Sequence, residues 1–451
     1  MISFFRNYFN QGHERSIKAK KNIFFLGLVK LLGILISLLL VPIAINYLDK
    51  HYYGIWLTVS SIVAWLALFD VGLSNGMKNK FAEAVAQGEE QKAKIYVSTT
   101  YFFLFVIFFC LWLVFLFANN YIDWCALLKI SKEHSQEVQT LVFIVISYFC
   151  VLFILRTINA LLTANQQPAK ASFFDTLGQL LAFLTIFILT KTTQGSLVYL
   201  GLGLTIPPLI VYLIANIYLF QGMFKKYIPS LKCVKIDYFK DIFGLSFKFF
   251  IIQMAALIQY QTANIIIARY FSMENVADYN IVYKYFNVLL MGFMILLTPF
   301  WSASTEAFSK KDFNWITNAI KRYKQLLLVF IGIGIILLFG SSLFYNFWIG
   351  EIVSIPFIMS FWCLIYMLTT MYGAIYVHLL NGIGAVKIQY YSSLATPILF
   401  ILLCWFFFSH LQLGIYSLFI ASIICNINGI LFAPFQYRQI FIKGKGGIWK
   451  A

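Results

Sequence analysis

Blocks of apolar residues, each about 20 residues long and repeated along the whole chain, constrain this sequence more than any other feature. Lipid offers no hydrogen-bond partners, so a bilayer-crossing segment must be a helix or part of a closed barrel. Of the 451 residues, 61% are hydrophobic and 11% charged, which excludes a soluble domain. We therefore predict an all-α integral membrane protein with twelve transmembrane helices, at residues 23–47, 53–71, 96–118, 140–163, 173–190, 197–220, 245–270, 277–300, 325–346, 355–378, 390–409 and 414–436.

The basic residues orient these spans. Lysine and arginine crowd the loops on one side, whereas the other side holds only Lys50, Lys129, Lys132 and Lys191. Cytoplasmic loops carry the excess of basic residues in membrane proteins. Both termini are therefore predicted to be cytoplasmic, and the net charge of +17 reflects membrane topology rather than nucleic-acid binding.

The two halves of the chain resemble each other weakly. The connection at 47–56, between the first two spans, aligns with the connection at 270–279, between the seventh and eighth. Many transporters consist of such repeats, with the substrate site between them. We predict a basic cytoplasmic segment at 1–22, an N-terminal six-helix bundle at 23–220, a cytoplasmic linker at 221–243, a C-terminal six-helix bundle at 244–436 and a cytoplasmic tail at 437–451.

Charged residues inside the predicted spans indicate the function. Ionisable groups at membrane depth usually face the protein interior or a water-filled path. The nearby acids Asp70, Asp175 and Asp278 lie at span edges, so acidic partners are scarce and water or a ligand must compensate the cations. For any single cation, snorkelling or helix packing is the alternative. As a set, they predict a hydrated cationic cavity for an anionic substrate, lined by Lys30, Arg156, Lys248, Arg269 and Lys284.

The seventh predicted span is the most polar. Five of its residues, Lys248, Ala255, Gln259, Thr262 and Arg269, share one helix face, which we expect to line something polar. Amide side chains suit sugar hydroxyls, and the candidates are Gln259, Asn264 and Asn287. The histidines and cysteines form no metal-ligand spacing and no CxxC motif, so neither a metal nor another cofactor is predicted.

A resemblance adds to this interpretation. The stretch FDVGLSNGMKNKFAEA at 69–84, followed by GEEQKAKIYVSTTYF at 88–102, resembles the region after the second span in Wzx-type flippases of O-antigen and capsule repeat units. These belong to the polysaccharide transporter family of the MOP superfamily, which also holds the multidrug and toxin exporters (MATE). The resemblance implies two six-helix bundles of the MATE/MOP-like kind in the bacterial inner membrane.

The resemblance also implies a substrate and a mechanism. The expected substrate is an undecaprenyl-diphosphate-linked glycan, moved by alternating access through a cationic cavity. Membrane lipids, a glycan polymerase and a chain-length regulator are the expected partners. A proton or sodium gradient is the expected energy source, and Asp70 and Asp175, near the inner mouth of such a cavity, are the gating or coupling candidates.

Three alternatives are open at this point. A multidrug exporter of the same superfamily is expected to hold a buried acid, yet the first span carries Lys30 instead. A flippase of lipid-linked peptidoglycan precursors handles similar chemistry, although such relatives commonly have extra spans. An intramembrane glycan-modifying enzyme needs a catalytic site, for which His378 with Asn381 is the best candidate.

Overall fold

The structure, a computed structural model, describes residues 14–64, 73–128, 134–165, 167–239, 254–255, 259, 261–350 and 355–449. All regular elements in these ranges are helical. Packing divides the chain into two compact units. The N-terminal unit comprises Met1–Asp49 and Ile62–Phe250, and the C-terminal unit comprises Lys50–Ser61 and Ile251–Ala451.

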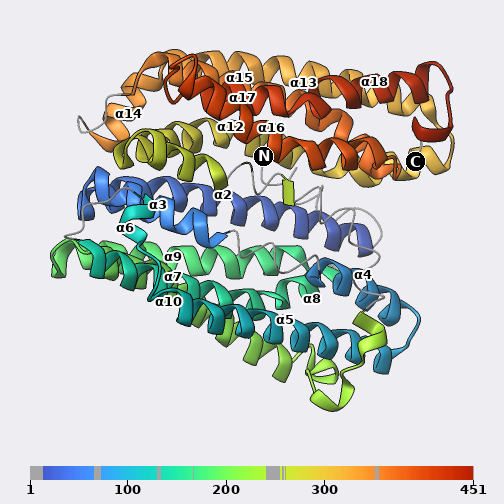
Figure 1. Ribbon diagram of the computed structural model, residues 1–451. Helices are drawn as coiled ribbons and strands as arrows, with labels where there is room; N and C mark the ends of the chain where they lie inside the picture. The colour runs from blue at the N-terminus through green and yellow to red at the C-terminus, as the bar shows by residue number, and fades with distance from the viewer. Residues whose placement is uncertain are drawn as a thin grey trace, which may run out of the picture. The chain divides into compact units, whose positions relative to one another are not determined.

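The N-terminal unit is built around α9. This helix packs against α2 on one side and α10 on another, while α10 also packs against α7, and α7 against α5 (Figure 1). Gly178 of α9 allows the close approach to α10, because a Cβ atom there would lie 3.1 Å from the Cα of Pro208. The helices are α2 (Glu14–Leu48), α4 (Leu73–Ala86), α5 (Glu90–Ala118), α6 (Trp124–Leu128), α7 (Ser135–Arg156), α8 (Ile158–Ala164), α9 (Pro168–Thr192) and α10 (Leu197–Gln221).

Residues 222–239, the part of the predicted linker that is described beyond the end of α10, pack on the N-terminal unit. The Phe224 ring meets Phe81 of α4 edge-on, and the Ser230 N–H donates to the Ser98 hydroxyl of α5 over 3.1 Å. Lys226 pairs with Glu90 at the start of α5, with 2.7 Å between nitrogen and oxygen. The Glu90 carboxylate raises the pKa of the Lys226 ammonium through this hydrogen bond and its charge. Residues 222–239 thus follow the surface of α5.

The C-terminal unit is organised around α15. This helix packs against α12, α13, α17 and the π-helical turn η5. The elements are α3 (Lys50–Ala64), of which Lys50–Ser61 belongs to this unit, α12 (Met273–Ser309), α13 (Phe313–Phe339), α14 (Ser341–Ile349), α15 (Phe357–Gly382), α16 (Lys387–Ser409), α17 (Ser417–Cys425), η5 (Asn428–Phe432), α18 (Ala433–Tyr437) and the π-helical η6 (Arg438–Ile442).

Two segments that align in the sequence repeat lie side by side in this unit. At the start of α3, Lys50 forms an ion pair of 2.8 Å with Asp278 of α12, and His51 contacts Glu274. Gly54 lies against the Met273 backbone in the same region. Any larger residue would collide there, because its Cβ atom would overlap the backbone of Met273.

Nine helices of the described chain are long and apolar enough to cross a membrane. A further pair of helical segments, Ser417–Cys425 and Asn428–Ile442, passes the same test together with a bend of 46° between them, and makes a tenth span if it is counted as one broken span. The other two predicted spans, 53–71 and 245–270, extend into residues outside the described ranges, so the count of twelve stays a prediction. Helices also exceed the predicted spans: α13 begins at Phe313 rather than 325, because the Asp312 carboxylate accepts the Trp315 N–H and caps the polar first turns.

Candidate functional site

A charged network lies among the helices of the N-terminal unit. Arg156, the last residue of α7, pairs with Asp175 of α9 at 3.0 Å. The Tyr212 hydroxyl of α10 donates to the same carboxylate over 2.6 Å, and the Asn159 amide donates to Tyr212 over 2.6 Å. Arg156 thus has as its partner one of the few acids that the sequence places near the predicted spans. The turn at residue 157 and the short α8 bring the end of α7 to the first turns of α9, which the linear sequence does not reveal.

The same network holds the end of α7. The Asn216 amide of α10 donates to the Leu155 carbonyl over 2.8 Å, which satisfies a backbone group near the helix end. In turn the Tyr101 hydroxyl of α5 donates to the Asn216 carbonyl oxygen over 3.0 Å. Four spanning helices are thus joined by side chains whose hydrogen bonds are made mainly to one another.

The other predicted residues occupy separate environments. Lys30 of α2 is exposed, and so is Arg269, ten residues after Gln259. Asn287 of α12 is half-buried. The Lys284 ammonium lies 3.3 Å from the Tyr53 hydroxyl of α3. Asp70 and Lys248 lie outside the described residues.

Asn264 is 4% exposed and belongs to a ladder of polar side chains. Its amide nitrogen donates to the Ser61 hydroxyl over 2.7 Å, and its carbonyl oxygen accepts from Asn280 over 2.8 Å. Both ends of the Asn264 amide are used in these bonds, so in this structure its side chain links Ser61 of α3 to Asn280 of α12.

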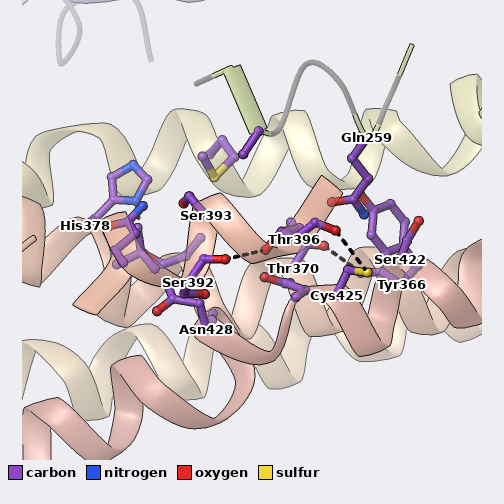
Figure 2. Close-up of a pocket in the computed structure, with 18 of the residues that line it drawn as sticks. Gln259, Tyr366, Thr370, His378, Ser392, Ser393, Thr396, Ser422, Cys425 and Asn428 are labelled. Carbon is purple, nitrogen blue, oxygen red and sulfur yellow. Dashed lines mark hydrogen bonds between the residues drawn. The ribbon is translucent and has the colours of Figure 1, made fainter. Parts of the chain in front are cut away.

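The C-terminal unit contains a cavity of about 420 Å³. It lies between α12, α15, α16 and the broken span, with Gln259 and Tyr366 toward one end and His378 toward the other (Figure 2). None of its described lining residues is Lys, Arg, Asp or Glu. The polar lining residues are Gln259, Tyr279, Tyr283, Tyr366, Thr370, His378, Gln389, Ser392, Ser393, Thr396, Ser422, Cys425, Asn426 and Asn428.

One wall of this cavity is a polar stripe on α16. Gln389, Ser392, Ser393 and Thr396 follow the i, i+3, i+4, i+7 spacing that places residues on one helix face. The Thr396 hydroxyl donates to the Ser392 carbonyl over 2.9 Å, which leaves its oxygen lone pairs as acceptors for a ligand. Sequence reasoning missed this stripe, although its spacing inside an apolar span is a readable signal.

A second wall is the break in the last span. Between α17 and η5 the chain bends at Asn426, and Asn426, Asn428 and Gly429 all line the cavity. The break approaches α15 closely, because a Cβ atom on Gly373 would lie 2.8 Å from the Cα of Gly429. Broken helices and π-turns occur often at binding sites of transporters, where they free backbone groups and set side chains at new angles.

His378 faces this cavity but has a local partner. Its Nδ1 lies 3.0 Å from the Ala374 carbonyl of the preceding turn, and its ring meets Trp301 edge-on at 5.9 Å. No described lining residue supplies the carboxylate that would orient it as a base. Within the described chain, no group of three His, Cys, Asp or Glu residues is arranged to hold a metal.

The cavity is suited to a neutral, hydroxyl-rich ligand. Its volume falls in the range of about 300–1,000 Å³ that is typical of small-molecule sites. Hydroxyl and amide groups can each donate and accept, and tyrosine rings add apolar faces. A charged ligand would find no opposite charge among the described lining residues.

Comparisons with known proteins identify a family and a fold. A sequence profile described as "Polysaccharide biosynthesis protein" matches residues 19–303. A Salmonella typhi protein named "Putative O-antigen transporter" is 21% identical over 272 residues, which span 60% of this chain and 61% of that protein. The inward-facing structure of a multidrug resistance MATE family transporter of the MOP superfamily is similar with a TM-score of 0.77 at 13% identity, over 92% of this chain and 96% of that chain.

The lipid II flippase MurJ, in an inward closed conformation, has the same fold. Its TM-score is 0.73 at 14% identity, over 94% of this chain and 88% of MurJ. The chain is thus a multi-pass membrane protein with the fold of these MATE and MurJ structures. The Salmonella typhi and MATE proteins that it resembles are named as transporters.

Proposed function

This chain belongs to the polysaccharide biosynthesis protein family, and from that premise we propose that it is a flippase for lipid-linked oligosaccharides. The proposed cargo is an undecaprenyl-diphosphate-linked repeat unit of O-antigen, capsule or exopolysaccharide. It would move from the cytoplasmic to the periplasmic face of the bacterial inner membrane by alternating access.

The neutral cavity of the C-terminal unit is the observation that carries this proposal. Its described lining offers hydroxyl, amide and aromatic groups and no Lys, Arg, Asp or Glu, as expected for a sugar site. An exporter of cationic drugs is expected to place an acid against its cargo, and no acid is found among these residues. The lining therefore favours a glycan over a drug cation.

The diphosphate of the cargo requires cations. Lys binds phosphate as a mobile point charge, whereas Arg can contact two phosphate oxygens at once. Our candidates for the diphosphate are Lys30, Arg156, Lys248, Arg269 and Lys284, of which Arg156 also forms an ion pair with Asp175.

We further propose that an ion gradient, of protons or sodium, supplies the energy. Asp175 is the described candidate for coupling, because its carboxylate accepts from a guanidinium of one helix and a hydroxyl of another. The product is a glycan unit on a lipid carrier, so a glycan polymerase and a chain-length regulator are its proposed users.

The position of the lipid-linked oligosaccharide in cells that lack the gene tests the proposal. A membrane-impermeant probe of sugars would be applied to intact spheroplasts and to inverted vesicles. We expect short units to accumulate on the cytoplasmic face and the gene to reverse this. Accumulation on the periplasmic face would identify a polymerisation defect, and an unchanged lipid-linked pool would exclude this cargo.

A further inference from the structure

A second hollow of the C-terminal unit lies between the end of α12 and the start of α13. Its volume is about 430 Å³. Phe300, 1% exposed, contacts both flanking rings, with centroids 6.3 Å from Trp315 and 4.8 Å from Tyr323. Eight residues line this groove, which we call the α12–α13 groove: Phe300, Ala303, Trp315, Asn318, Ala319, Arg322, Tyr323 and Leu326.

The α12–α13 groove lies where α13 changes character. Toward the helix start the sequence is polar and basic, with Lys321, Arg322 and Lys324, and from Leu326 onward it is almost continuously apolar. Trp315 and Tyr323 are the residue types that sit at the level of lipid headgroups. The groove therefore extends from headgroup level into the hydrocarbon, on the side that the loop charges predict to be cytoplasmic.

The charge in the groove is positive and unmatched. Arg322 is exposed, and among the side chains that the structure describes it forms no ion pair. Asp312, the nearby acid at the start of α13, uses its carboxylate to accept the Trp315 N–H over 3.0 Å. Lys311, Lys321 and Lys324 add positive charge around the same turns. A negatively charged group complements this surface better than a zwitterion does.

We propose that the α12–α13 groove is a binding site for an anionic phospholipid of the surrounding leaflet. Arg322 and Asn318 bind the phosphate, and Trp315 and Tyr323 flank the glycerol region. Phe300 and Leu326 contact an acyl chain. The site is separate from the cavity lined by α15 and α16, and it requires no glycan cargo, so it stands or falls independently of the flippase function.

Native mass spectrometry of the purified protein with phosphatidylglycerol tests the assignment. We expect Arg322→Gln to weaken the tightest binding event about tenfold, since it removes a charge-assisted contact, and Arg322→Lys to keep part of the binding. Arg438→Gln is the matched control, because Arg438 is also exposed and lies at the predicted cytoplasmic end of its helix but outside the groove. Equal losses in Arg322→Gln and Arg438→Gln would overturn the proposal.

Quenching by brominated lipids locates the bound molecule. The protein has ten tryptophans, so the signal of Trp315 is the difference between the unmodified protein and Trp315→Phe. We expect brominated phosphatidylglycerol to quench this difference more strongly than brominated phosphatidylcholine, and Arg322→Gln to abolish the preference. Equal quenching by the two lipids would refute an anionic site. Displacement of phosphatidylglycerol by undecaprenyl diphosphate at equimolar amounts would also refute it and reassign the groove to the cargo.

Discussion

The charged network of the N-terminal unit and the neutral cavity of the C-terminal unit place polar groups among helices in opposite ways. In the network, Arg156, Asp175 and Tyr212 satisfy one another. In the cavity, groups such as the Thr396 hydroxyl donate to their own helix and keep acceptor lone pairs free. The difference teaches that a charged residue inside an apolar span can be neutralised by another residue of the protein. Uncharged hydroxyl and amide groups, which are less conspicuous in a sequence, can instead form the open site.

The two sites should also depend on different forces. The cavity depends on a close backbone contact, whereas the network depends on an ion pair and its hydrogen bonds. Three experiments test this contrast, and a fourth adds an exposed surface pair for comparison, beginning with the largest expected effect.

Adding one methyl group at the α15 crossing should destabilise the C-terminal unit most. Gly373→Ala places a Cβ atom 2.8 Å from Gly429, and such overpacking typically costs about 1–3 kcal/mol. Gly332→Ala of α13 is the matched control, because a Cβ atom there has no neighbour within 4 Å. Thermal unfolding in detergent would measure both variants. Equal stability would show that the broken span does not depend on this contact.

Breaking the ion pair of the network should have the next largest effect. Arg156→Gln or Asp175→Asn should each lower the free energy of unfolding by about 1–2 kcal/mol, a value reduced because both side chains are partly exposed. The double variant should lose less than the sum, with a coupling energy of about 1 kcal/mol. A double-mutant cycle of unfolding free energies measures this. Strict additivity would mean that the network does not act as a unit.

Removing one cavity hydroxyl should reduce transport without unfolding the protein. Thr396→Val should slow glycan transport in proteoliposomes about 2- to 10-fold, the value of one hydrogen bond to a ligand. Thr185→Val of α9 is the control, because its hydroxyl makes the same backbone bond, 2.9 Å to the Leu181 carbonyl, outside the cavity. If both variants transport equally well, the α16 stripe does not contact the cargo.

The surface pair of Lys226 and Glu90 should matter least. Both side chains are largely exposed, 70% and 55%, so Glu90→Gln should change the melting temperature by less than about 1 °C at pH 7. The raised pKa of Lys226 means that its contribution is complete below the unfolded-state value of about 10.4 and is lost as the pH rises through the folded-state pKa. A larger difference that persists in 1 M salt would contradict a screened surface pair.

The sequence by itself determined the class of the protein and much of its helix plan. Apolar blocks of the right length have few other stable forms in lipid, and nine of the predicted spans are helices long and apolar enough to cross a membrane. The stretch at 69–84 identified the family, and residues 19–303 match its profile. The sequence also predicted that one face of the seventh span lines something polar, and two residues of that face, Ala255 and Gln259, line the cavity.

Only the tertiary structure decided which polar groups meet. The pair of Arg156 and Asp175 requires α7 and α9 to be neighbours, and neighbouring helices are set by packing surfaces rather than by hydropathy. The α16 stripe was overlooked because serine and threonine are nearly neutral on a hydropathy scale, although together they line a cavity. The bend at Asn426 lies near the close approach of Gly373 to Gly429, which brings together residues far apart in the chain. Charge and hydropathy are properties of single residues, whereas a binding site is a property of how helices pack.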